Sequence, residues 1–172
     1  VLAGGVPVPI YPPVRRQQLE DHLSRQSRIL SNCGAVMLVT TDDALTVAHL
    51  LTASVESLRR VLGAGALVAS SDELERVVRR AEDTAFLQST SGSTGDPKGV
   101  ILTHANLMAN MRADGQGMAA TPNDVFVSWL PLYHDMGLIG AWLGSLYHAV
   151  RLVVMPPMTF LARPERWLWA IH

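Results

Sequence analysis

Phe86-Leu-Gln-Ser-Thr-Ser-Gly-Ser-Thr-Gly-Asp-Pro-Lys-Gly-Val100 joins two apolar segments through a loop of small and polar residues. The segment that enters this loop is Ala85-Phe-Leu87, and the segment that leaves it is Gly99-Val-Ile-Leu102. Apolar segments that carry β-branched and aromatic side chains favour strands. The sequence therefore predicts a strand–loop–strand unit at this point of the chain.

The loop between Thr90 and Lys98 has the composition of an anion-binding site. Its glycines allow backbone N–H groups to converge on one point, and its hydroxyl groups add hydrogen-bond donors. The Lys98 amine supplies a positive charge that suits phosphate. Together these groups fit a polyphosphate.

Two other interpretations fit the loop less well. In the Walker pattern Gly-x-x-x-x-Gly-Lys-Ser/Thr the lysine follows a glycine directly, whereas here Asp96 and Pro97 separate Gly95 from Lys98. A P-loop phosphotransferase is therefore disfavoured. A plain Ser/Gly linker would leave both the Pro-Lys-Gly-Val ending and the flanking strands unexplained.

Four segments together resemble the adenylate-forming superfamily. Thr90-Ser-Gly-Ser-Thr-Gly-Asp-Pro-Lys-Gly99, within the phosphate loop (residues 88–100), is similar to the signature shared by acyl-CoA synthetases, luciferases and adenylation domains. The substrate-side motif, Ser128-Trp-Leu-Pro-Leu-Tyr-His-Asp-Met-Gly-Leu-Ile-Gly140, and Phe160-Leu-Ala-Arg-Pro-Glu-Arg-Trp167 resemble fatty-acyl-AMP ligases most closely. Val6-Pro-Val-Pro-Ile-Tyr-Pro-Pro13 resembles the segment ahead of their nucleotide site.

The resemblance implies that ATP activates a fatty acid to an acyl-adenylate, which then passes to an acyl carrier protein. Transfer to coenzyme A, as in an acyl-CoA synthetase, stays open, and so does a nucleotide-binding fragment without catalysis. ATP and Mg²⁺ are the implied cofactors. Because Mg²⁺ in such sites prefers phosphate oxygens and water, we expect no cluster of protein ligands for it.

The resemblance also assigns individual residues. The expected phosphate-binding residues are Thr90, Ser91, Gly92, Ser93, Thr94, Gly95 and Lys98. The expected catalytic residues are Lys98, facing phosphate, and His134, which follows a predicted strand and would orient the acid or the α-phosphate as a neutral imidazole. The expected acid-binding residues are His134, Met136, Gly137, Leu138, Ile139 and Trp142. His104, His148 and Cys33 show no converging partners and are expected to be structural.

Composition narrows the class of protein further. The chain has 172 residues, a net charge of −1 and a single cysteine. A balanced charge gives no electrostatic reason to bind nucleic acid. One cysteine excludes an internal disulfide and favours a reducing compartment, the cytoplasm. No apolar run reaches the roughly 18 residues of a membrane span.

Strands that alternate with helices predict an α/β fold, with a mainly parallel sheet and flanking helices. Strands are predicted at residues 35–40, 66–69, 85–87, 99–102, 125–129 and 151–155. Helices are predicted at 15–31, 42–62, 70–80, 104–118 (N-capped by Thr103), 136–147 and from 163 onward.

By the resemblance, residues 1–172 form a single fragment of the large N-terminal domain, and the C-terminal domain and later catalytic motifs are absent. We expect the fragment to be inactive on its own. We also expect it to self-associate, because its apolar faces would lack their usual partners.

Overall fold

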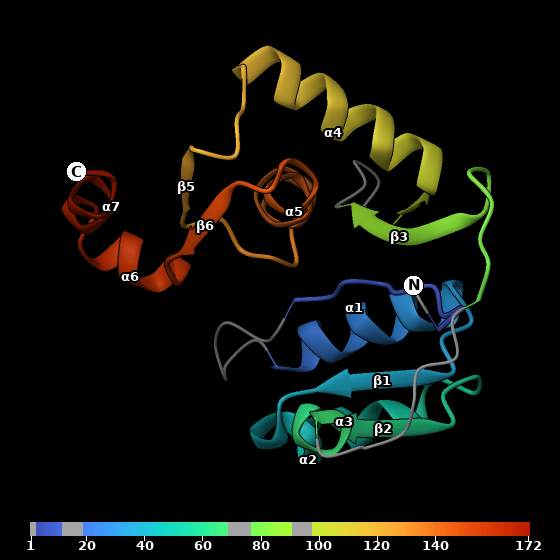
Figure 1. The fold of residues 1–172 in the computed structure, drawn as a ribbon. Helices are drawn as coiled ribbons and strands as arrows, with labels where there is room; N and C mark the ends of the chain where they lie inside the picture. Colours follow the sequence, from blue (N-terminus) through green and yellow to red (C-terminus); the bar gives the residue numbers. More distant parts are fainter. Residues whose placement is uncertain (1–2, 12–18, 69–76, 91–97) are drawn as a thin grey trace. The chain divides into compact units, whose positions relative to one another are not determined.

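The computed structural model describes residues 3–11, 19–68, 77–90 and 98–172. The chain, drawn in Figure 1, divides into two compact units. Each unit has its own apolar core. Unit 1 comprises Val1–Val78 and Leu87–Ile101, and unit 2 comprises Arg79–Phe86 and Leu102–His172. None of the helices in the described part has the length and apolar character that a bilayer crossing requires.

Unit 1 is built on two short parallel strands, β1 (Met37–Thr40) and β2 (Arg60–Gly63), in a register that pairs Met37 with Arg60. The helix α1 (Leu19–Asn32) precedes them, and η2 (Asp42–Ala44), α2 (Leu45–His49) and η3 (Leu50–Ala53) connect them. The core of this unit is formed by Leu30, Leu38, Ala48, Leu51, Val55 and Leu58. The predicted strand at 35–40 is thus confirmed over four of its residues.

The predicted helix at 42–62 and the predicted strand at 66–69 are wrong. The helical turns end at Ala53, residues 60–63 form β2, and Ala64–Val68 is the helix α3. Apolar spacing could not reveal the change, because Val55 and Leu58 are buried whether or not the helix continues. Pairing with β1 gives the 60–63 backbone its hydrogen-bond partners.

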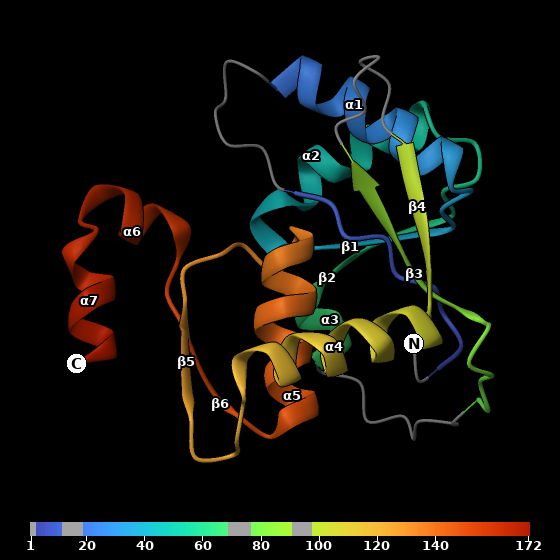
Figure 2. The same ribbon diagram turned by 90° about the horizontal axis from the view of Figure 1, so that it is seen from above.

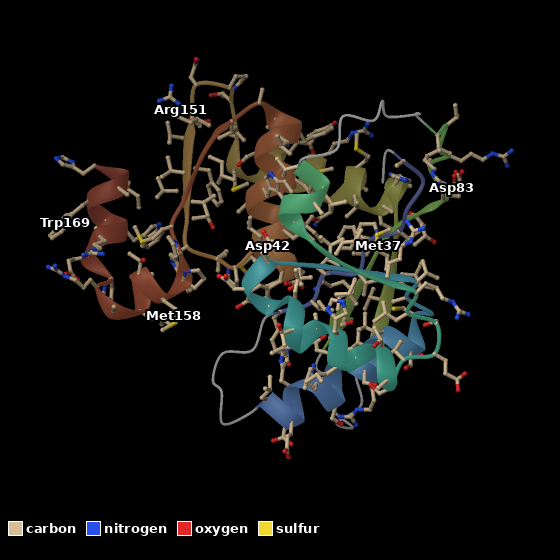
Figure 3. All side chains as sticks on the ribbon, turned by 90° about the horizontal axis from the view of Figure 1, so that it is seen from below. Met37, Asp42, Asp83, Arg151, Met158 and Trp169 are labelled. Atoms are coloured by element: carbon tan, nitrogen blue, oxygen red, sulfur yellow. The ribbon has the colours of Figure 1, made fainter. Side chains whose placement is uncertain are left out.

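Glycines let the connection after β2 pack closely against the end of β1. A Cβ on Gly63 or Gly65 would overlap the Asp42 carboxylate, which follows β1 (Figure 3). Close approach, and not helix termination, therefore explains both glycines. Of the predicted helix at 70–80, residues 70–76 lie outside the described part, and residues 77–80 are not helical.

The two strands predicted on either side of the phosphate loop are confirmed. The strands β3 (Thr84–Thr90) and β4 (Lys98–Thr103) pair with each other, and both are longer than predicted. The N–H of Leu87 donates to the carbonyl oxygen of Pro7 across 3.0 Å, which fits an extended segment beside β3.

Unit 2 contains α4 (His104–Met118), η4 (Met136–Leu143) and α5 (Gly144–His148) beside a second parallel pair. That pair is β5 (Val125–Ser128) and β6 (Arg151–Val154), followed by α6 (Pro157–Ala162) and α7 (Glu165–Ile171). Figure 2 shows β5 and β6 running side by side. The predicted α/β class is confirmed, and both strand pairs with a defined direction are parallel.

Local capping explains where α4 begins and ends. The Thr103 hydroxyl accepts the N–H of Asn106, and the Asn106 side chain accepts the N–H of Thr103, each across 3.1 Å. This reciprocal pair stabilises the first turn, so the predicted N-cap is confirmed. Ala119 ends α4 and Ala149 ends α5 in left-handed conformations, with φ of 51° and 55°.

Candidate functional site

Thr90 is the last residue of β3 and Lys98 the first of β4, so the range 88–100 predicted for the phosphate loop is strand at both of its ends. The Thr90 hydroxyl donates to the carbonyl oxygen of Lys98 across 3.4 Å, and the Lys98 side chain is exposed. This bond closes the base of the loop. Residues 91–97, among them Ser91, Gly92, Ser93, Thr94 and Gly95, lie outside the described residues, so their phosphate-binding roles stay predictions.

His134 lies in the turn between β5 and η4. Its N–H donates to the carbonyl oxygen of Pro131 across 3.1 Å, and its own carbonyl accepts the N–H of Leu138 across 2.8 Å. The backbone is thus held on both sides, while the side chain is 63% exposed. His134 therefore follows the carboxyl end of a parallel strand, where open α/β sheets bind ligands.

Asp135 orients the His134 ring. Its Oδ1 lies 2.6 Å from His134 Nδ1 and also accepts the N–H of Met136 across 2.7 Å. A neutral ring that donates from Nδ1 would present a lone pair at Nε2 and would repel an anion. A ring protonated at both nitrogens would present an N–H at Nε2 as well, and that form, not the neutral imidazole expected from the sequence, would suit a carboxylate or phosphate. Asp135 lies within the substrate-side motif, but sequence reasoning did not assign it this orienting role, for which the signal was an acidic residue at the start of a predicted helix.

The predicted helix at 136–147 is wrong in its first part. Met136–Leu143 is a π-helix, in which the Gly144 N–H donates to the carbonyl oxygen of Ile139, five residues earlier. Such segments are rare and occur frequently at functional sites. Gly137 has a packing role, because a Cβ there would overlap the Pro131 carbonyl.

The predicted acid-binding residues of η4 differ in how far they are exposed to solvent. Leu138 is buried in the unit 2 core, and Ile139 packs against that core. Met136 is 61% exposed and Trp142 is 44% exposed. Met136 and Trp142 are therefore the members of this set best placed to contact a ligand, and all of these roles stay predictions.

An aromatic cluster connects α6 and α7 to the end of β5. The Trp129 and Phe160 rings stack with centroids 4.0 Å apart, and Trp167 meets Phe160 edge-on. The Trp167 indole N–H donates to the carbonyl oxygen of Val127 across 2.9 Å. The segment 160–167 therefore braces the strand that leads to His134.

The His148 side chain is hydrogen-bonded to the backbone, as in a structural histidine. Its Nε2 lies 2.8 Å from the carbonyl oxygen of Met111 on α4. The ring borders a cavity of about 270 Å³, whose other lining residues include Met118, Phe126 and Gly140.

Cys33 donates its S–H to the carbonyl oxygen of Leu30 across 3.4 Å, and burial raises the pKa of the thiol.

No three His, Cys, Asp or Glu side chains converge as metal ligands within the described ranges. At the two described ends of the phosphate loop, Thr90 offers a hydroxyl group and Lys98 a positive charge.

Comparison with known proteins identifies related sequences and folds. Residues 1–172 match the family model described as AMP-binding enzyme. A medium-chain-fatty-acid–[acyl-carrier-protein] ligase, TtuA of Teredinibacter turnerae, is 48% identical over 52% of this chain and 14% of its own length. The long-chain-fatty-acid–AMP ligase FadD26 of Mycobacterium bovis is 35% identical over 96% of this chain and 29% of its own length.

A solved structure of a similarly named ligase resembles this chain in its fold. The fatty acyl-adenylate ligase of L. pneumophila, in complex with acyl adenylate and pyrophosphate, superposes with a TM-score of 0.82 at 33% identity. The superposition covers 99% of this chain and 29% of that chain. The chain thus spans less than a third of the length of each of these relatives.

Proposed function

The chain belongs to the AMP-binding enzyme family, and from that premise we propose that the protein activates a fatty acid with ATP to form an acyl-adenylate and pyrophosphate. The observation that carries the proposal is the Asp135-oriented imidazole of His134, at the end of a parallel strand. The same chain bears the phosphate loop between β3 and β4. Residues 1–172 would form one part of a larger N-terminal domain.

The protein's task in such a reaction is mainly to position two anions and to compensate moving charge. Lys98, with Ser91, Gly92, Ser93, Thr94 and Gly95 of the loop and the Thr90 hydroxyl, would hold the β- and γ-phosphates. Mg²⁺, when bound, would neutralise charge on the triphosphate. Protonated His134 would donate from Nε2 to the acid carboxylate or the α-phosphate and so reduce the repulsion between them.

The acid side of the site would use the exposed surface of η4. Met136 and Trp142 offer apolar contact there, and the neighbouring Leu138 fixes the helix in the core. The acceptor would be an acyl carrier protein, in line with the acceptor in the name of the Teredinibacter relative. The cytoplasm is the expected location.

The test is product analysis with the full-length protein. Fatty acid, Mg²⁺ and ATP labelled at the α-phosphate should yield labelled acyl-AMP and release pyrophosphate, as read by thin-layer chromatography and mass spectrometry. Adding an acyl carrier protein should convert acyl-AMP to an acyl thioester on that protein. Efficient thioester formation on coenzyme A would favour the acyl-CoA synthetase alternative, and ADP with an acyl phosphate would overturn the adenylation proposal.

A further inference from the structure

His148 connects the end of α5 to the middle of α4. Its Nε2 donates to the carbonyl oxygen of Met111 across 2.8 Å, between residues 37 positions apart in sequence. The helices α4 and α5 lie against each other (Figure 2). Because one side of the ring borders the 270 Å³ cavity, packing alone does not hold it, and the hydrogen bond fixes its position.

Gly115 makes room for this ring. It lies one helical turn after Met111, and a Cβ built on it would meet the Nε2, Cε1 and Cδ2 atoms of His148. Gly117, only two residues further along α4, would meet nothing within 4 Å. Glycine inside a helix destabilises it by about 1 kcal/mol relative to alanine. At position 115 the glycine has a specific reason, because a larger side chain would overlap the His148 ring.

A second bond reinforces the first. The Nε of Arg112 donates to the Tyr147 hydroxyl across 3.0 Å, and the Tyr147 ring meets the His148 ring edge-on, with centroids 4.8 Å apart. Arg112 adjoins Met111 on α4, and Tyr147 adjoins His148 on α5. We call these contacts the α4–α5 clasp.

The clasp holds the far end of the segment that begins at His134. The helix α5 continues directly from the π-helix η4, because Gly144 follows Leu143 without a break. Near its start the same segment is held by Leu138, in a core shared with Leu107 and Met111 of α4. Since π-helical turns are rare and occur mostly as single turns within α-helices, we expect η4 to depend on these two attachments to keep its place.

We propose that Gly115 and His148 are positioning residues for the acid side of the site: the clasp sets where η4, and with it His134 and Met136, lies against α4. This inference rests on the proposed function. Neither residue touches substrate. They act by fixing the helix whose exposed face receives the acid.

Kinetics of the full-length enzyme test this, with four variants. Gly115→Ala and His148→Ala should each raise the KM for the fatty acid about tenfold, the effect of losing one hydrogen bond that places a binding surface. The KM for ATP should stay within about twofold, because the phosphate loop lies on other strands. Gly117→Ala is the matched control and should leave both constants unchanged. His148→Gln, which keeps an amide N–H donor of similar reach, should recover most of the loss.

A double variant tests whether Gly115 acts through His148. If the Cβ added by Gly115→Ala harms the enzyme only by displacing the ring, that substitution should cost nothing more in the His148→Ala background. Additive losses would overturn the inference, and so would a KM for ATP that rises as much as the KM for the fatty acid in folded variants. A wild-type protein that forms no acyl-AMP would overturn the proposed function instead, and an active wild type with unaffected variants would overturn only the clasp.

Discussion

The Nδ1 atom of His134 lies 2.6 Å from Oδ1 of Asp135, and that same oxygen caps the N–H of Met136. One carboxylate therefore both starts the π-helix and aims the imidazole. The two tasks have different chemical requirements, since capping needs only an acceptor whereas charge compensation needs the negative charge.

Substituting Asp135 should separate these tasks. In the full-length enzyme, Asp135→Asn should keep the cap and the melting temperature, yet lower kcat/KM for the fatty acid about tenfold through the lost charge. Asp135→Ala should in addition lower stability by about 1 kcal/mol. Melting curves and adenylation assays on both variants make the comparison. Wild-type kinetics in Asp135→Asn would show that the carboxylate charge does not act through His134.

Lys98→Ala should weaken turnover more than it weakens acid binding. A charge-assisted contact is worth about 1.5–3 kcal/mol, so kcat/KM for ATP should fall about 10- to 150-fold. Lys98→Arg keeps the charge and should fall less. An unchanged kcat/KM for ATP in folded Lys98→Ala would place the amine away from phosphate.

Replacing Ala119 or Ala149 with glycine should stabilise the protein. Both alanines adopt positive φ, which costs a non-glycine residue about 1–2 kcal/mol. Glycine removes this cost, but it also raises the conformational entropy of the unfolded chain, which offsets part of the stabilisation. Each variant should therefore unfold with a free energy about 0.5–1 kcal/mol higher. Ala109→Gly, at an exposed position inside α4, is the control and should destabilise by about 1 kcal/mol. Equal losses at all three sites would contradict the prediction.

The Cys33 thiol should react slowly with alkylating reagents. Burial raises its pKa because the thiolate is disfavoured away from water, and the thiolate is the nucleophile. At mildly alkaline pH, iodoacetamide should therefore modify native Cys33 more slowly than the urea-unfolded chain. The raised pKa also predicts a pH dependence of stability. The folded protein should lose stability as the pH rises above the pKa that the Cys33 thiol has in the unfolded chain, because only the unfolded chain then ionises readily. Equal native and unfolded rates would mean that the side chain is open to solvent.

The helices that could be predicted from the sequence begin at residues with local signals, such as a capping side chain or a proline. The wrong predictions concern elements whose conformation is set by contacts with residues distant in the sequence. Thr103 marked the start of α4 through its own side chain, and α7 followed Pro164 as predicted. By contrast, β2 pairs with β1, and the π-helix packs against α4 through Leu138. The hydrogen bond of His148 could not be predicted for the same reason, because its acceptor is the backbone carbonyl of Met111, a group that any residue could supply.

The isolated 172-residue chain should bind ATP weakly, form no acyl-adenylate and self-associate. Met158 and Trp169, which point away from α6 and α7 in Figure 3, are 66% and 65% exposed. Leu161 and Leu168 are similarly exposed nearby, giving an apolar surface of the kind that drives association. Light scattering alongside calorimetric titration with ATP·Mg tests this. A monodisperse monomer with micromolar ATP affinity would contradict it.

The aromatic cluster gives the protein a built-in optical probe. Of its four tryptophans, Trp129 stacks on Phe160 and Trp167 is hydrogen-bonded to β5, whereas Trp142 and Trp169 are 44% and 65% exposed. Acrylamide should therefore quench the second pair selectively, leaving an emission dominated by the two indoles at the strand end before His134. Ligand binding at that turn can then be followed in the unlabelled protein through fluorescence that originates beside it.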